Sequence, residues 1–171
     1  MTSLDLGEYS QGVEGRKNMS LAIEKLLTPV VGHPAKQTVE QQGRLNIAVV
    51  FTSVESTLAA LKEAGTLAQS LGAQITLLVP QVVPYPLPLE SPPVLVDFSE
   101  KRFHVIASQS PVETKVSIYL CRDQMETLRS VLRPGSIVVI GGRKRWWPTK
   151  EARLAHKLRK AGHEVLFKET E

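Results

Sequence analysis

Short apolar runs alternate with helical patterns along the chain from Leu45 onward. The runs are rich in Val, Ile and Leu and are bounded by glycine, proline or polar residues, which is typical of buried strands. They cover residues 47–51, 74–79, 114–121, 136–140 and 165–167. Because helical patterns separate them, we predict an α/β fold with an open parallel five-stranded sheet and helices on both faces.

Polar caps and glycines mark the ends of three predicted helices. The capping residues are Thr52 with Glu55, Asp123 with Glu126, and Pro148 with Thr149. The helices end at Gly72, at Pro134-Gly135 and at Gly162. The residues predicted to face the sheet recur at helical spacing: Leu58, Leu61, Gly65, Ala68 and Leu71; Met125, Leu128, Val131 and Leu132; and Leu154, Leu158 and Ala161.

Proline dominates the segment that follows the second predicted strand. Six of the fourteen residues from Pro80 to Pro93 are proline, which excludes a helix and predicts a stiff, extended loop. Residues 98–108 then fit a helix, although residues 103–106 also fit a strand. The face that such a helix would share consists of Phe98, Arg102, Val105 and Ile106.

The first 44 residues differ from the rest in composition. Residues 1–17 are polar, residues 18–27 have a short helical pattern that ends before Pro29, and residues 28–44 are typical of a linker. We therefore predict an N-terminal tail over residues 1–44 and one α/β domain over residues 45–171.

Net charge is +4, but its distribution is uneven. Eight Lys or Arg residues and a single acid, Glu151, lie between Arg143 and Lys160. This pattern has two interpretations: a local field that attracts phosphate, nucleic acid or an anionic membrane, or an ordinary solvated helix face. No apolar run approaches the roughly 18 residues that span a bilayer, nothing at the N-terminus resembles a signal peptide, and the one cysteine fits a reducing cytoplasm.

The fourth predicted strand leads into the main candidate site, Gly141-Gly142 followed by three cations and Trp146-Trp147. Ligands of open α/β sheets bind beyond the carboxyl ends of the strands, where glycine lets a backbone approach a phosphate. The predicted anion-binding residues are Thr52, Ser53, Gly141, Gly142, Arg143, Lys144, Arg145, Lys150 and Arg153. Lys150, Arg153, Lys157 and Lys160 fall on one stripe of the last helix.

Trp146 and Trp147 have two interpretations. Paired aromatic residues beside cations suit base stacking, a membrane interface or a protein partner. Alternatively, one indole covers the end of the sheet and the other caps the last helix.

Other site chemistry is missing from the sequence. It has neither G-x-x-x-x-G-K-[ST] nor G-x-G-x-x-G, and its four histidines lack metal-type spacing. Cys121 is predicted to be a buried structural thiol. With no carboxylate pair or nucleophile–base pattern, we expect a protein that is not an enzyme.

From Leu45 to Lys168 the chain resembles the universal stress protein family. The resemblance rests on residues 49–53, on residues 122–132 followed by the glycine-bearing residues 137–143, and on residues 161–167. It implies a Rossmann-like sheet of strand order 3-2-1-4-5, frequent homodimers and, in many members, adenine nucleotide binding.

The chain departs from the family at the nucleotide site. Phe51 stands where nucleotide-binding members have an aspartate that contacts adenine, and Lys144 or Arg145 replaces the next glycine of the phosphate loop. The later glycine pair is replaced by residues 153–155. We therefore expect a regulatory module with weakened or lost ATP binding, which docks on itself or on a protein partner. The alternative is a protein that binds nucleic acid or an anionic surface through Arg143–Lys160.

Overall fold

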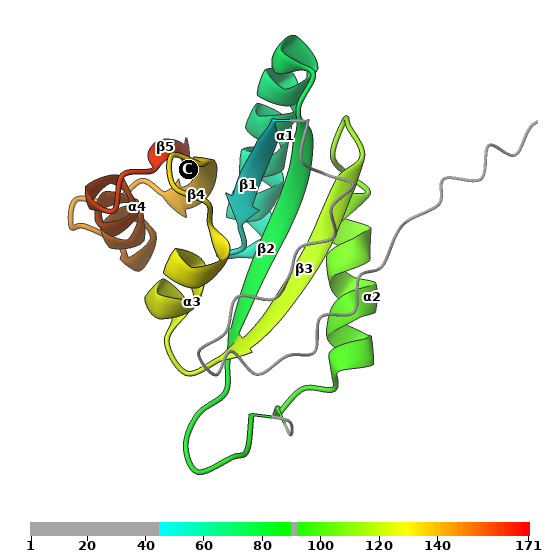
Figure 1. Ribbon diagram of the computed structural model, residues 1–171, viewed down its shortest axis with the longest axis vertical. Helices are drawn as coiled ribbons and strands as arrows, with labels where there is room; N and C mark the ends of the chain where they lie inside the picture. The colour runs from blue at the N-terminus through cyan, green and yellow to red at the C-terminus, as the bar shows by residue number, and fades with distance from the viewer. Residues whose placement is uncertain (1–44, 90–91) are drawn as a thin grey trace, which may run out of the picture.

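Five strands and four helices alternate in the computed structural model, which describes residues 45–89 and 92–171 (Figure 1). The strands are β1 (Asn46–Val50), β2 (Gln74–Val82), β3 (Thr114–Cys121), β4 (Ile137–Arg143) and β5 (Glu164–Thr170). The helices are α1 (Val54–Leu71), α2 (Val96–Ala107), α3 (Gln124–Val131) and α4 (Lys150–Lys160). The tail and short helix predicted within residues 1–44 lie outside the described residues.

The strands form one parallel sheet in the order β3-β2-β1-β4-β5. Both the predicted α/β class and the predicted strand order are confirmed. The order reverses between β1 and β4, so their carboxyl ends form the topological switch point at which such sheets bind ligands.

Alternating side chains of the central strand serve two separate cores. Ile47 and Val49 lie in the core under α1 and α2, whereas Ala48 and Val50 lie in the core under α3 and α4. The helices therefore cover the sheet in pairs, α1 with α2 on one face and α3 with α4 on the other (Figure 1). All four of these β1 side chains are buried, as expected for a parallel strand with helices on both faces.

Two of the three predicted helix starts are confirmed. Asp123 accepts a hydrogen bond from the Glu126 amide at 2.7 Å, and Thr149 accepts one from the Ala152 amide at 3.2 Å. The start predicted at Thr52 is wrong by one residue. The N-cap of α1 is Ser53, whose hydroxyl accepts from the Ser56 amide at 3.2 Å.

The predicted faces of α2 and α4 need correction. Residues 98–108 do lie mostly in a helix, but its buried face consists of Ser99, Phe103, Ile106 and Ala107. Phe98 and Val105 are 63% and 65% exposed. In α4, Ala155 is buried with Leu154 and Leu158, whereas Ala161 is exposed. At the end of α1, Leu71 is exposed as well.

Three strands extend further than predicted: β2, β4 and β5, the last of which covers Glu164–Thr170 and not only residues 165–167. β2 continues through Pro80 to Val82, where it pairs with Cys121 of β3, so the proline-rich loop begins later than Pro80. β4 continues through both glycines to Arg143, which pairs with Thr170 of β5. The prediction that the strand ends at the glycines is therefore wrong.

Gly141 permits a close contact between α1 and β4. A Cβ atom at this position would collide with the backbone carbonyl oxygen of Ser56 in the first turn of α1. The Thr52 hydroxyl also donates a hydrogen bond to the Gly141 carbonyl at 2.9 Å. A Cβ at Gly142 would instead meet the end of the Phe167 ring, 2.6 Å from Cζ, and Glu151 Cβ at 3.0 Å. A Cβ at position 141 would thus meet fixed backbone, whereas the nearest atom to a Cβ at position 142 belongs to a side chain that can rotate.

We predict that Gly141→Ala lowers the free energy of unfolding by about 1–3 kcal/mol, the usual cost of overpacking. Gly142→Ala is the matched control and costs less, because Phe167 can rotate. Urea unfolding followed by far-ultraviolet circular dichroism measures both. Equal or greater loss in Gly142→Ala would contradict the packing role of Gly141.

Candidate functional site

Apolar packing occupies the end of β1, where the family resemblance expects an aspartate. Phe51 directly follows the strand and packs against the core under α1 and α2. Its ring meets Phe103 of α2 edge to face, with the centroids 4.8 Å apart. This position therefore offers no carboxylate to a ligand.

The hydroxyl groups predicted to bind an anion have partners within the fold. Thr52 donates to Gly141, and Ser53 caps α1. The Thr52 amide donates to the Thr57 hydroxyl at 3.2 Å. These side chains build the junction between β1, α1 and β4.

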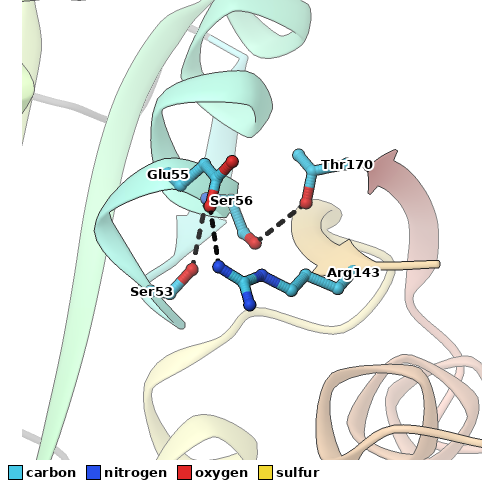
Figure 2. Close-up of polar contacts among 5 residues, drawn as sticks. All are labelled: Ser53, Glu55, Ser56, Arg143 and Thr170. Atoms are coloured by element: carbon cyan, nitrogen blue, oxygen red, sulfur yellow. Dashed lines mark hydrogen bonds and ion pairs between the residues drawn. The ribbon is translucent and has the colours of Figure 1, made fainter. Parts of the chain in front are cut away.

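An ion pair crosses from α1 to the end of β4. The Arg143 guanidinium donates to the Glu55 carboxylate at 3.0 Å, and the Ser56 and Thr170 hydroxyl oxygens lie 3.2 Å apart beside it (Figure 2). Both charged side chains are more than half exposed, so the pair adds only about 0.2–1 kcal/mol to stability. The larger effect of this ion pair is on charge. The Glu55 carboxylate compensates the charge of Arg143 and lies at the N-terminus of α1, and such a helix N-terminus would otherwise attract an anion.

Lys144 also faces an acid, the Glu169 carboxylate, at 3.9 Å. The remaining predicted cations, Arg145, Lys150 and Arg153, are exposed and make no ion pair within the described parts of the chain. Arg153 Nε lies 3.5 Å from the Thr149 carbonyl, at the limit of a hydrogen bond. The predicted residues therefore fall into two groups. Thr52, Ser53, Arg143 and Lys144 belong to an inner group with partners in the fold. Arg145, Lys150 and Arg153 form an outer group.

The outer group continues along α4. Its buried residues are Leu154, Ala155 and Leu158. Lys150, Arg153, Lys157 and Lys160 are all exposed, so the cationic stripe predicted for this helix is confirmed. Whether these cations bind an anion stays a prediction.

Trp146 and Trp147 project from the segment between β4 and α4. They are 94% and 77% exposed. The interpretation in which one covers the sheet and the other caps α4 is therefore wrong, because neither indole is buried. Their interpretation as a partner surface stays a prediction.

Sequence reasoning missed the residues that close the inner site. Glu55 was assigned to a helix cap, and neither Phe103 nor Thr170 was connected to the site. These residues come close only when α1, α2 and β5 pack, with 88 positions between Glu55 and Arg143. The sole local signal for Glu55 was an acid in the first turn of a helix.

Cys121 lies at the end of β3 and is buried, as predicted. Burial raises the pKa of the Cys121 thiol, a hydrogen bond with the Thr127 side chain opposes this, and the Asp123 charge adds to it. Arg122, its neighbour, is occupied elsewhere: its guanidinium lies 4.2 Å from the centre of the Tyr85 ring. Within residues 45–89 and 92–171, no group of three or more His, Cys, Asp or Glu side chains is placed to hold a metal ion.

We predict that Cys121 reacts with Ellman's reagent at least about tenfold more slowly in the folded protein than in urea, at a pH of about 8. The thiolate is the reactive form, and a raised pKa shifts its formation in the folded state to higher pH. The rate in the folded protein should therefore increase as the pH rises. Cys121→Ser is the blank, because the chain has no second cysteine. Equal rates in folded and unfolded protein would contradict the burial of this thiol.

Comparison with known proteins identifies the fold. No protein-family model matches the chain, and no curated protein sequence matches it significantly. Among solved structures, the universal stress protein UspA from Lactobacillus plantarum is 18% identical, with 72% of this chain and 96% of that chain aligned and a TM-score of 0.50. A universal stress protein in complex with cAMP is 15% identical, with 72% and 95% aligned and a TM-score of 0.45.

No helix in the described residues is long and apolar enough to cross a membrane.

Strand order, helix placement and the likeness to UspA agree. The described part of the chain has the universal stress protein fold.

Proposed function

We propose that this chain is a non-catalytic regulatory module whose sheet edge has lost ATP binding and whose basic segment after β4 binds an anionic partner. The observation that carries the proposal is the ion pair between Glu55 and Arg143 at the switch point, beside exposed cations that make no such pair. The basic segment is residues 144–153.

Three features of the inner site disfavour a nucleotide. Phe51 provides no acceptor for an adenine amino group and packs on Phe103. The Ser56 backbone lies against Gly141, so the glycine is already used for packing. The Arg143 guanidinium is paired with the Glu55 carboxylate, so its charge is not free to attract a triphosphate.

The outer cations favour an anionic partner. Arg145, Lys150 and Arg153 lie near the start of α4, where the helix dipole adds partial positive charge. Like charges along one helix face also repel each other by a few tenths of a kcal/mol per pair, and a bound anion relieves that repulsion. The attraction is electrostatic, so it weakens as salt increases.

The proposal includes a cytoplasmic homodimer that acts in a stress response, as the fold suggests. β5 lies at one edge of the sheet. The Val165 carbonyl on its outer side accepts from the Arg159 guanidinium, and a second copy could pair with the other outer backbone groups, for which the described residues provide no partner strand. Leu166 of this strand is partly exposed and adds an apolar contact.

We predict that isothermal titration calorimetry with ATP or AMP detects no binding tighter than a Kd of about 1 mM. Inorganic polyphosphate should bind, with an affinity that falls as salt rises. The variant Arg145→Ala/Lys150→Ala/Arg153→Ala should lose most of this affinity. The matched control removes three exposed cations elsewhere, as Lys62→Ala/Lys101→Ala/Arg129→Ala, and should retain it.

Micromolar binding of ATP would overturn the loss of the nucleotide site. Equal loss of polyphosphate affinity in the two triple variants would contradict the role of the basic segment, because it would reveal an effect of net charge alone. Binding of short single-stranded DNA through the same segment would support the alternative, a nucleic-acid-binding protein.

A further inference from the structure

The two adjacent tryptophans are an exposed apolar feature that the fold does not explain. Each indole adds a large apolar area when it is covered. In the described residues, Trp146 is the most exposed of the large hydrophobic side chains, at 94%, and Trp147 follows it in the chain. Packing of this domain requires neither, so their placement points to something that covers them.

Both ends of the tryptophan segment are anchored. On one side the Lys144 amide donates to the Thr170 carbonyl at 2.9 Å, continuing the β4–β5 ladder. On the other side Thr149 caps α4. The indoles therefore stand on a short connection between two fixed elements.

Cations surround this short connection. Lys144 and Arg145 precede the tryptophans, and Lys150 and Arg153 follow them in the first turn of α4. All four are exposed. The result is an aromatic tip with a cationic collar, where the tip is residues 146–147 and the collar is these four side chains.

The form of the tip favours a flat, deformable partner. An indole that is 94% exposed has almost no protein around it, so the site has no walls to enclose a nucleobase or a peptide. Tryptophan is enriched at membrane–water interfaces, where its ring meets the headgroup region and its N–H stays hydrated. Lysine and arginine beside it are attracted by the negative potential of anionic lipids.

The helix itself cannot be the inserting element. An interfacial amphipathic helix places its apolar face in the bilayer. In α4 that face is Leu154, Ala155 and Leu158, and it is buried in the core under α3 and α4. Apolar contact with a membrane must therefore come from the tip.

We infer that the tip and collar dock this protein on bilayers that contain anionic lipid, with Trp146 and Trp147 entering the headgroup region. This rests on the proposed anion-binding role of the basic segment and names its partner. Binding requires both parts: the collar provides attraction over distance, and the indoles provide the contact.

Intrinsic tryptophan fluorescence can follow membrane docking, because the chain contains only two tryptophans and both are in the tip. Vesicles of phosphatidylcholine with phosphatidylserine should shift the tryptophan emission to shorter wavelength and sediment the protein. Pure phosphatidylcholine vesicles should do neither, and added salt should weaken the binding.

Two variants separate contact from charge. Trp146→Ala/Trp147→Ala should lose about tenfold or more in affinity for the anionic vesicles, measured by sedimentation, because the inserted apolar area is lost. Leu95→Ala/Phe98→Ala removes two exposed apolar side chains at the start of α2, which covers the opposite face of the sheet from α4. They are 78% and 63% exposed, and this variant should bind as the unchanged protein does. All four side chains are exposed, so circular dichroism should find both variants folded.

The outcomes distinguish this inference from the proposed function. No vesicle binding, with polyphosphate binding intact, overturns the membrane inference and leaves the proposed function standing. If the unchanged protein binds neither vesicles nor polyphosphate, both the membrane inference and the proposed function are overturned. Vesicle binding that Trp146→Ala/Trp147→Ala leaves unchanged also overturns the inference, since charge alone would then explain it.

Discussion

The close approach of α1 to β4 at Gly141 determines the arrangement of this sheet edge. The missing Cβ lets the Ser56 carbonyl lie against the strand, and the Thr52 hydroxyl bonds to the Gly141 carbonyl. Ser56 also reaches Thr170, so the first turn of α1 is joined to two strands at once. With the helix in this position, the Glu55 carboxylate meets Arg143.

The proposed function rests on the positions and charges of the residues at this sheet edge. The switch point of a parallel sheet normally faces a ligand, but here Phe51 and an ion pair occupy it. The charges that remain available lie one segment further along the chain, beyond the end of β4. The chain thus has the universal stress protein fold, with an aromatic pair and an ion pair at the ends of β1 and β4.

Local patterns in the sequence were sufficient for most of the fold. Branched apolar runs and caps such as Asp123 predicted the strands and helices, because these signals act over a few residues. Strand order came from the resemblance to universal stress proteins. The buried side of α2 was not predictable in this way: both Phe98 and Phe103 are apolar, and only packing on the sheet decides which is covered.

The contacts within the candidate site could not be predicted from the sequence, for a physical reason. Gly141 looked like a phosphate-binding residue, but its role as a packing contact depends on α1, about 85 residues earlier in the chain. The pairing of Glu55 with Arg143 has the same origin. By contrast, the cationic stripe on α4 was found from spacing alone, because helical periodicity fixes it.

The central claim is that ligand binding has moved from the inner sheet edge to the basic segment. A backbone amide chemical-shift map of the protein titrated with inorganic polyphosphate, and separately with ATP, tests it most directly. The account predicts polyphosphate-induced shifts concentrated in residues 144–153, with residues 51–56 unchanged by either compound. Saturable shifts at residues 51–56 on adding ATP would contradict it.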